Sequence, residues 1–119
     1  MRTSDKKVNP SLKNQIETVF AQTIADLRDL REATAFLKDF FNETELEAFA
    51  KRLAIAYWLA KGRSYNNIKE NLKVSSATIA TVQAMMEREG FKLALKKIEA
   101  EEWANVWAEK IKKFTKLTK

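Results

Sequence analysis

The chain has 119 residues, about the size of one domain, and contains only two glycines and one proline, too few for the many turns of a compact β protein. It has no cysteine and no histidine, which excludes disulfides, thiol nucleophiles, cysteine-ligated metals and the commonest general base. Lysine and arginine number 22 against 16 aspartates and glutamates, so the net charge is +6, which is compatible with nucleic-acid binding.

Residues 1–8 are predicted to be a flexible tail, and residues 9–119 a single helical domain. Asn9 and Pro10 are the residue types preferred at a helix cap and at the first helical position. A helical stripe of apolar residues follows, formed by Leu12, Ile16, Val19, Phe20, Ile24, Leu27 and Leu30. This stripe predicts one helix that continues to Leu30, and a short apolar cluster at 36–41 predicts a brief second helix.

The next predicted helix covers residues 43–61. Asn42 and Glu45 have the spacing of a capping box, and Gly62 supplies a C-terminal stop. The aromatic residues Tyr57 and Trp58 widen its apolar surface, so we expect it to be buried on more than one side. Its inward residues are predicted to be Leu46, Phe49, Leu53, Ile55, Ala56 and Leu59.

Residues 64–82 have the pattern of a helix-turn-helix, two short helices joined by a tight turn. Ser64 caps the first helix and Ser75 the second, which Gly90 is predicted to end. The residues expected to face inward are Tyr65, Ile68 and Leu72, then Ile79 and Val82. Lys73 occupies a turn position that usually takes glycine because the backbone is left-handed there.

Residues 91–119 are predicted to form a long amphipathic helix with a net charge of +4. Its apolar positions recur at three- and four-residue steps. They are Leu95, Ile98, Trp103, Val106, Trp107, Ile111, Phe114 and Leu117.

The helix-turn-helix predicts DNA binding through its second helix, at 75–89. Short side chains at the start of that helix let its backbone approach the bases, and its free amides favour phosphate. Basic residues around the motif would neutralise phosphates. The candidate DNA-binding residues are Arg63, Asn66, Lys69, Lys73, Ser75, Ser76, Ala77, Thr78, Thr81 and Gln83.

Other functions remain open on the sequence. Residues 75–83 contain no arginine, the commonest guanine reader, and residues 32–91 carry no net charge. Both features favour a helical protein-interaction module with only non-specific nucleic-acid affinity. An enzyme is not expected, because the carboxylates are scattered and no glycine-rich phosphate loop exists; no cofactor or metal is expected either. The longest uncharged apolar run, 53–60, is too short for a membrane span, so we expect a cytoplasmic protein.

Residues 41–88 resemble the core of the Trp repressor-like proteins, especially the shorter YerC/YecD-type branch. The resemblance depends on two stretches that align after a one-residue deletion behind Gly62. It is carried by Glu45, Glu47, Ala48, Arg52, Ile55, Leu59 and Gly62, and then by Leu72, Ala77, Thr78 and Ile79.

This resemblance implies an all-α transcriptional regulator, a repressor, that binds double-stranded DNA as an intertwined homodimer and is found on the nucleoid when bound. It implies dimerisation helices at 9–41, a core at 42–90 with the helix-turn-helix at 64–89, and a C-terminal helix at 91–119. Trp103 and Trp107 suit the dimer interface or, equally, the core of one chain.

The resemblance also implies a remnant of an effector pocket at Asn42, Arg52, Thr81 and Val82. In the repressor, two arginines and a glycine hold tryptophan. Arg52 matches the first arginine, but Thr81 stands in place of the second and Val82 in place of the glycine. We therefore expect no switching by tryptophan.

Overall fold

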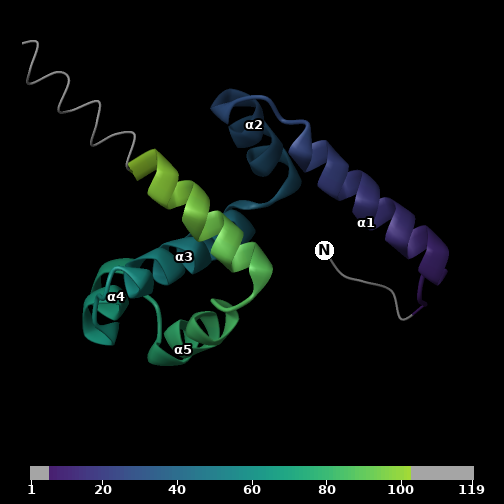
Figure 1. The fold of residues 1–119 in the computed structure, drawn as a ribbon. Helices are drawn as coiled ribbons and strands as arrows, with labels where there is room; N and C mark the ends of the chain where they lie inside the picture. Colours follow the sequence, from purple (N-terminus) through teal and green to yellow (C-terminus); the bar gives the residue numbers. More distant parts are fainter. Residues whose placement is uncertain (1–5, 103–119) are drawn as a thin grey trace, which may run out of the picture. The chain divides into compact units, whose positions relative to one another are not determined.

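The computed structural model of the protein describes residues 6–102, and every regular element in that range is a helix (Figure 1). Five helices, α1 to α5, precede a sixth helical stretch at 89–102. The predicted all-α fold of about six helices is therefore confirmed. The chain divides into two compact units, residues 1–46 and residues 47–119.

The first unit contains α1 (Pro10–Ala25) and α2 (Leu30–Phe40). As predicted, Asn9 caps α1: its side-chain oxygen accepts hydrogen bonds from the amides of Ser11, at 2.8 Å, and Leu12, at 3.4 Å. The predicted continuation of this helix to Leu30 is wrong, because α1 ends at Ala25.

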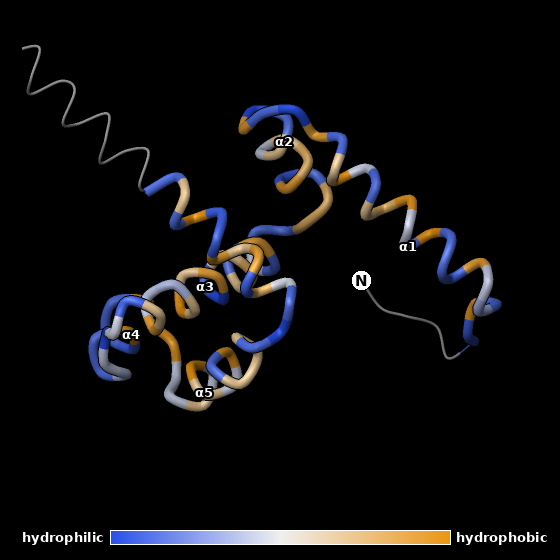
Figure 2. The backbone as a smooth tube through the Cα atoms, viewed as in Figure 1, coloured by the Kyte–Doolittle hydropathy of each residue, from blue (hydrophilic) through white to orange (hydrophobic). Residues whose placement is uncertain are grey.

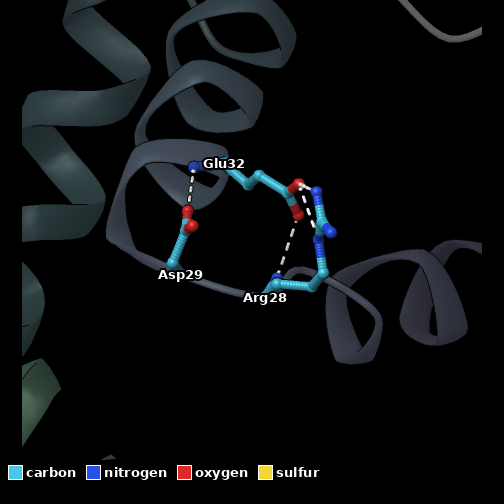
Figure 3. Close-up of polar contacts among 3 residues, drawn as sticks. All are labelled: Arg28, Asp29 and Glu32. Atoms are coloured by element: carbon cyan, nitrogen blue, oxygen red, sulfur yellow. Dashed lines mark hydrogen bonds and ion pairs between the residues drawn. The ribbon is translucent and has the colours of Figure 1, made fainter.

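Local capping explains the break between α1 and α2 (Figure 3). The Asp29 carboxylate accepts the Glu32 amide at 2.9 Å. Glu32 in turn accepts the Arg28 amide at 3.0 Å and pairs with the Arg28 guanidinium at 2.6 Å. These hydrogen bonds satisfy amides that a new helix leaves free, so α2 starts here although the apolar spacing runs on.

The apolar residues of the first unit stay largely exposed. Figure 2 shows hydrophobic positions recurring along α1 between hydrophilic ones, and neither α1 nor α2 contains a buried residue. Phe20 lies against Phe36 and Phe40, with ring centroids 5.7 and 5.9 Å away, while Ile16 remains 52% exposed. This unit therefore presents an apolar surface rather than a closed core.

Helix α3 (Glu43–Ala60) has the predicted cap at each end. Asn42 and Glu45 exchange hydrogen bonds of 2.8 and 3.0 Å, which confirms the capping box. Gly62 has a φ of 82°, and the amide of Arg63 bonds back to the Trp58 carbonyl at 3.0 Å. This left-handed ending is the one that favours glycine.

The second unit is built around a small core. Helices α4 (Tyr65–Leu72) and α5 (Ser76–Met85) pack with α3 and the stretch 89–102. Among residues 6–102 the buried ones are Ile55, Ala56, Ile68, Ile79 and Val82, and Tyr65 and Leu72 are partly buried against them. The inward positions predicted for the helix-turn-helix are therefore confirmed. Phe49 and Leu53 were predicted inward as well, but they are 45% and 37% exposed, so that prediction is wrong.

The end of α5 also differs from the sequence prediction. The helix stops at Met85, because the amides of Met86 and Arg88 bond to Gln83 and Met85 and close a turn. Gly90 lies inside the following helical stretch and does not end a helix. The predicted C-terminal helix is observed from 89 to 102, and its remaining positions, with Trp103 and Trp107, lie outside the described residues.

None of the helices that the structure describes is long and apolar enough to cross a membrane.

Candidate nucleic-acid interface

The turn between α4 and α5 has the expected left-handed residue. Lys73 has a φ of 56° and a ψ of 51°, and its amide bonds to the Lys69 carbonyl at 3.0 Å. Its conformation reverses the chain between two helices of 8 and 10 residues. The sequence pattern and the geometry thus agree on a helix-turn-helix.

Two serines fix the starts of the motif's helices. Ser64 accepts the Asn67 amide and Ser75 accepts the Thr78 amide, both at 3.1 Å. The hydroxyls of Ser75 and Thr78 are also 2.9 Å apart. Thr78 is thus engaged in the cap of α5, beside the exposed Ser76 and Ala77. The first turn of α5 therefore presents short side chains and a positive dipole end.

Helix α5 has one buried and one exposed face. Ile79 and Val82 are 0% and 2% exposed, whereas Ala77, Ala80 and Thr81 are exposed. The burial of one face by the core leaves the other face free for a partner.

A polar contact joins the two helices of the motif. The Tyr65 hydroxyl at the start of α4 donates to the side-chain oxygen of Gln83 on α5. Gln83, which the sequence places among the DNA-binding candidates, is therefore already bonded within the protein. The contact could not have been found by spacing, because it joins residues 18 positions apart.

The basic candidates lie exposed around α4. Arg63 stacks over the Trp58 ring, 4.1 Å from its centroid, and donates to the Asn67 side chain at 3.2 Å. Lys69 and Lys73 are exposed, as is Asn66, and no carboxylate among the described residues pairs with either lysine. Their charges are therefore available to phosphates, and Arg63 is held in place by Trp58 and Asn67, two residues that the sequence did not indicate.

The residues of the predicted remnant effector pocket have different surroundings in the structure. Arg52 lies over Phe49, with its guanidinium carbon 5.3 Å from the ring centroid, at an apolar hollow of about 420 Å³. Thr81 and Val82 are not among the residues that line this hollow; Thr81 is exposed and Val82 is in the core. Asn42 serves as the cap of α3. The hollow is lined by Phe49, Arg52, Leu53, Arg88, Gly90, Phe91 and Ala94.

A hydrogen bond between Tyr57 of α3 and Glu102 ties the stretch 89–102 to α3. It raises the pKa of Tyr57 above its usual value. The hydrogen bonds from Tyr57 and then Lys61 hold the pKa of Glu102 below its usual value, and Lys61 Nζ lies 3.0 Å from a Glu102 carboxylate oxygen. The contact braces the second unit.

Two short capped helices, a left-handed turn and an exposed second helix define a helix-turn-helix protein. The chain belongs to the Trp repressor protein family, whose model matches residues 15–99. The resemblance seen in the sequence is therefore confirmed.

Individual proteins agree with this assignment. The chain is 29% identical over 82 residues to the uncharacterized protein YerC of Bacillus subtilis (strain 168), an alignment that covers 67% of this chain and 79% of YerC. Its fold matches the crystal structure of a TrpR-like protein from Eubacterium eligens ATCC 27750 with a TM-score of 0.68 and 29% identity. That match covers 76% of this chain and 96% of the other.

Proposed function

We propose that this protein is a homodimeric transcriptional repressor that binds a specific DNA sequence through α5. The observation that carries the proposal is the geometry of the helix-turn-helix. The buried face of α5 is fixed by Ile79 and Val82, and its capped first turn and outer face are exposed. A recognition helix needs this arrangement to enter the major groove.

The charges around the motif support DNA as the partner. Lys69 in α4 and Lys73 in the turn before α5 are unpaired among the described residues. The amides at the start of α5 favour phosphate as well. For each phosphate that the protein neutralises, the slope of log K against the logarithm of the salt concentration becomes more negative by about 0.9. Membership of the Trp repressor family supports a regulator rather than an enzyme, and DNA binding implies a cytoplasmic location, on the nucleoid when bound.

A dimer is proposed because the first unit exposes more apolar surface than a lone chain would be expected to leave uncovered. Ile16 is 52% exposed, Val19 65% and Phe40 60%. A second copy that covers these side chains would exclude water from them. Two copies of α5 would then contact half-sites about 34–36 Å apart.

The proposed repressor does not use tryptophan as a corepressor. Val82 is 2% exposed and contributes to the core, where the resemblance requires a glycine beside the ligand. Thr81 has no guanidinium group with which to hold the carboxylate of a ligand. Its hydroxyl donates instead to the Ala77 carbonyl, at 2.9 Å. Addition of L-tryptophan is expected to leave operator affinity unchanged.

The test is a binding selection from random duplex DNA, followed by affinity measurements on the recovered sequence. Ser76→Glu should weaken binding on the order of tenfold or more, because a carboxylate would face phosphates. A glutamate in the first helical turn is favourable for the helix itself, so loss of binding would not reflect unfolding. Ser11→Glu, in the first turn of α1, is the matched control and should bind normally.

Enrichment of a two-fold symmetric sequence would support the repressor. Retention of all DNA alike, with loss as salt rises, would instead favour the alternative of a helical interaction module with non-specific nucleic-acid affinity. Equal binding by Ser76→Glu and the unmodified protein would rule out α5 as the recognition helix.

A further inference from the structure

Three polar side chains of α5 that were candidates for reading bases, those of Thr78, Thr81 and Gln83, are engaged within the protein. The Thr78 hydroxyl lies 2.9 Å from that of Ser75, and the Thr81 hydroxyl donates to the Ala77 carbonyl. The Gln83 side chain accepts the Tyr65 hydroxyl. Each of these hydrogen bonds uses one donor or acceptor of the side chain and fixes the orientation of the side chain, so it is less free to turn toward a base.

The exposed face of α5 offers no charged reader in their place. Ala77, Ala80 and Ala84 are exposed on it together with Thr81. No lysine or arginine occurs between Lys73 and Arg88, so α5 lacks the side chains that bond bidentately to guanine. What these residues present to a partner is methyl groups, including that of Thr81, whose hydroxyl is bonded to its own helix.

The major groove contains one apolar group that such a face can recognise, the C5-methyl group of thymine. Short side chains also let the helix backbone come close to the bases. We infer that α5 reads its operator by apolar contact with thymine methyl groups through Ala77, Ala80 and Thr81. The inference rests on the proposed function, and it specifies the operator as one whose half-sites present thymines at the contacted positions.

Gln83 is a positioning residue on this account. Its bond to Tyr65 joins α5 to the start of α4, so it sets the angle at which the methyl-bearing face is offered to the groove. It is not expected to read adenine, the base that a free glutamine prefers.

The experiment uses the operator recovered from the selection and replaces its thymines one at a time by deoxyuridine. Uracil lacks only the methyl group and keeps the pairing edge and the O4 acceptor. At contacted positions, affinity should fall about fourfold, the fold-change that corresponds to about 0.8 kcal/mol per buried methyl or methylene group. Thymines outside the half-sites are the control and should be replaceable without loss.

Protein variants then assign the contact. Ala80→Gly should lose most of the discrimination between thymine and uracil at one position, while Gln83→Ala should weaken binding to both duplexes by the same factor. If Ala80→Gly unfolds, as shown by its circular dichroism, Ala77→Gly provides the second test. A Gln83→Ala variant that changes base preference at an adenine would overturn the positioning role.

The outcomes separate this inference from the proposed function. A specific operator that binds equally well with uracil throughout, but weakly when purine N7 is replaced by carbon, would overturn the methyl readout and leave the repressor intact. Absence of any enriched sequence would overturn both.

Discussion

Lys73 is the one described residue other than glycine with a positive φ, 56°. Left-handed backbone costs a residue with a side chain roughly 1–2 kcal/mol, and glycine avoids that cost. Lys73→Gly is therefore expected to raise the free energy of unfolding by about 1 kcal/mol, measured by urea denaturation. The same change at Lys69, inside α4, is the control and should lower stability by about 1 kcal/mol.

A destabilised Lys73→Gly variant would show that the turn is not left-handed in solution. If Lys73 neutralises a phosphate, the same variant should also bind DNA more weakly and with a shallower salt dependence.

Tyr65 carries the side-chain bond between α4 and α5. Tyr65→Phe removes the hydroxyl and keeps the ring, which packs against the core. We expect operator affinity to fall several-fold, because a hydrogen bond of this kind contributes roughly 0.5–1.5 kcal/mol to holding the two helices. The helical signal should not change.

Tyr57→Phe is the matched control for this prediction. Its hydroxyl is also hydrogen-bonded, but to Glu102 outside the motif, so the variant should bind DNA normally. Equal losses in the two variants would mean that general destabilisation, and not the angle between α4 and α5, governs binding.

Among the elements, the stretch 89–102 depends on a carboxylate for its attachment to α3. The pKa of Glu102 is held below its ordinary value of 4.5 by hydrogen bonds from Tyr57 and Lys61. A group with a lowered native pKa contributes stability that is complete above its unfolded pKa and is lost as the pH falls through the native pKa. This attachment should therefore weaken as the pH drops below about 4.5.

Glu102→Gln tests this dependence, because the amide keeps the shape and cannot ionise. The variant should show a smaller loss of thermal stability between pH 5 and pH 3 than the unmodified protein, as followed by circular dichroism. In the first unit, the hydrogen bonds from Arg28 lower the pKa of Glu32. The contribution of Glu32 to stability should therefore depend on pH in the same way in the variant and in the unmodified protein. Identical pH profiles would remove Glu102 from this role.

The sequence predicted the elements better than their ends. Caps at Asn9, Ser64 and Ser75 could be found because short polar side chains have a defined local partner. The break before α2 was missed although Asp29 and Glu32 have capping spacing, because the apolar stripe outweighed it. The end of α5 at Met85 has no residue signal, since neither glycine nor proline marks the turn.

The candidate site was only partly predictable for the same reason. Residue types and local spacing indicated the turn at Lys73 and the short side chains in the first turn of α5. They could not show that Gln83 bonds to Tyr65 or that Trp58 and Asn67 hold Arg63, because these contacts depend on tertiary packing. Apolar spacing predicts Phe49 and Leu53 as core because it cannot distinguish a core from a surface that a partner covers.

For the whole molecule, assembly and DNA binding should be coupled through α1. Ile16 lies on the apolar stripe of this helix and is 52% exposed. If that stripe is the surface that a second copy covers, Ile16→Glu places a charge where water would be excluded, a change that typically costs several kcal/mol. Sedimentation should then show a monomer where the unmodified protein is a dimer.

The same variant should lose operator affinity although α5 is unchanged, because one copy can contact only one half-site. Binding to an isolated half-site should be unaffected, which separates lost assembly from lost recognition. Asn14→Glu adds the same charge to the opposite side of α1, two residues away, and should remain dimeric with full affinity. A dimeric Ile16→Glu variant would exclude the α1 stripe as the interface, and a monomer with full operator affinity would contradict two-copy recognition.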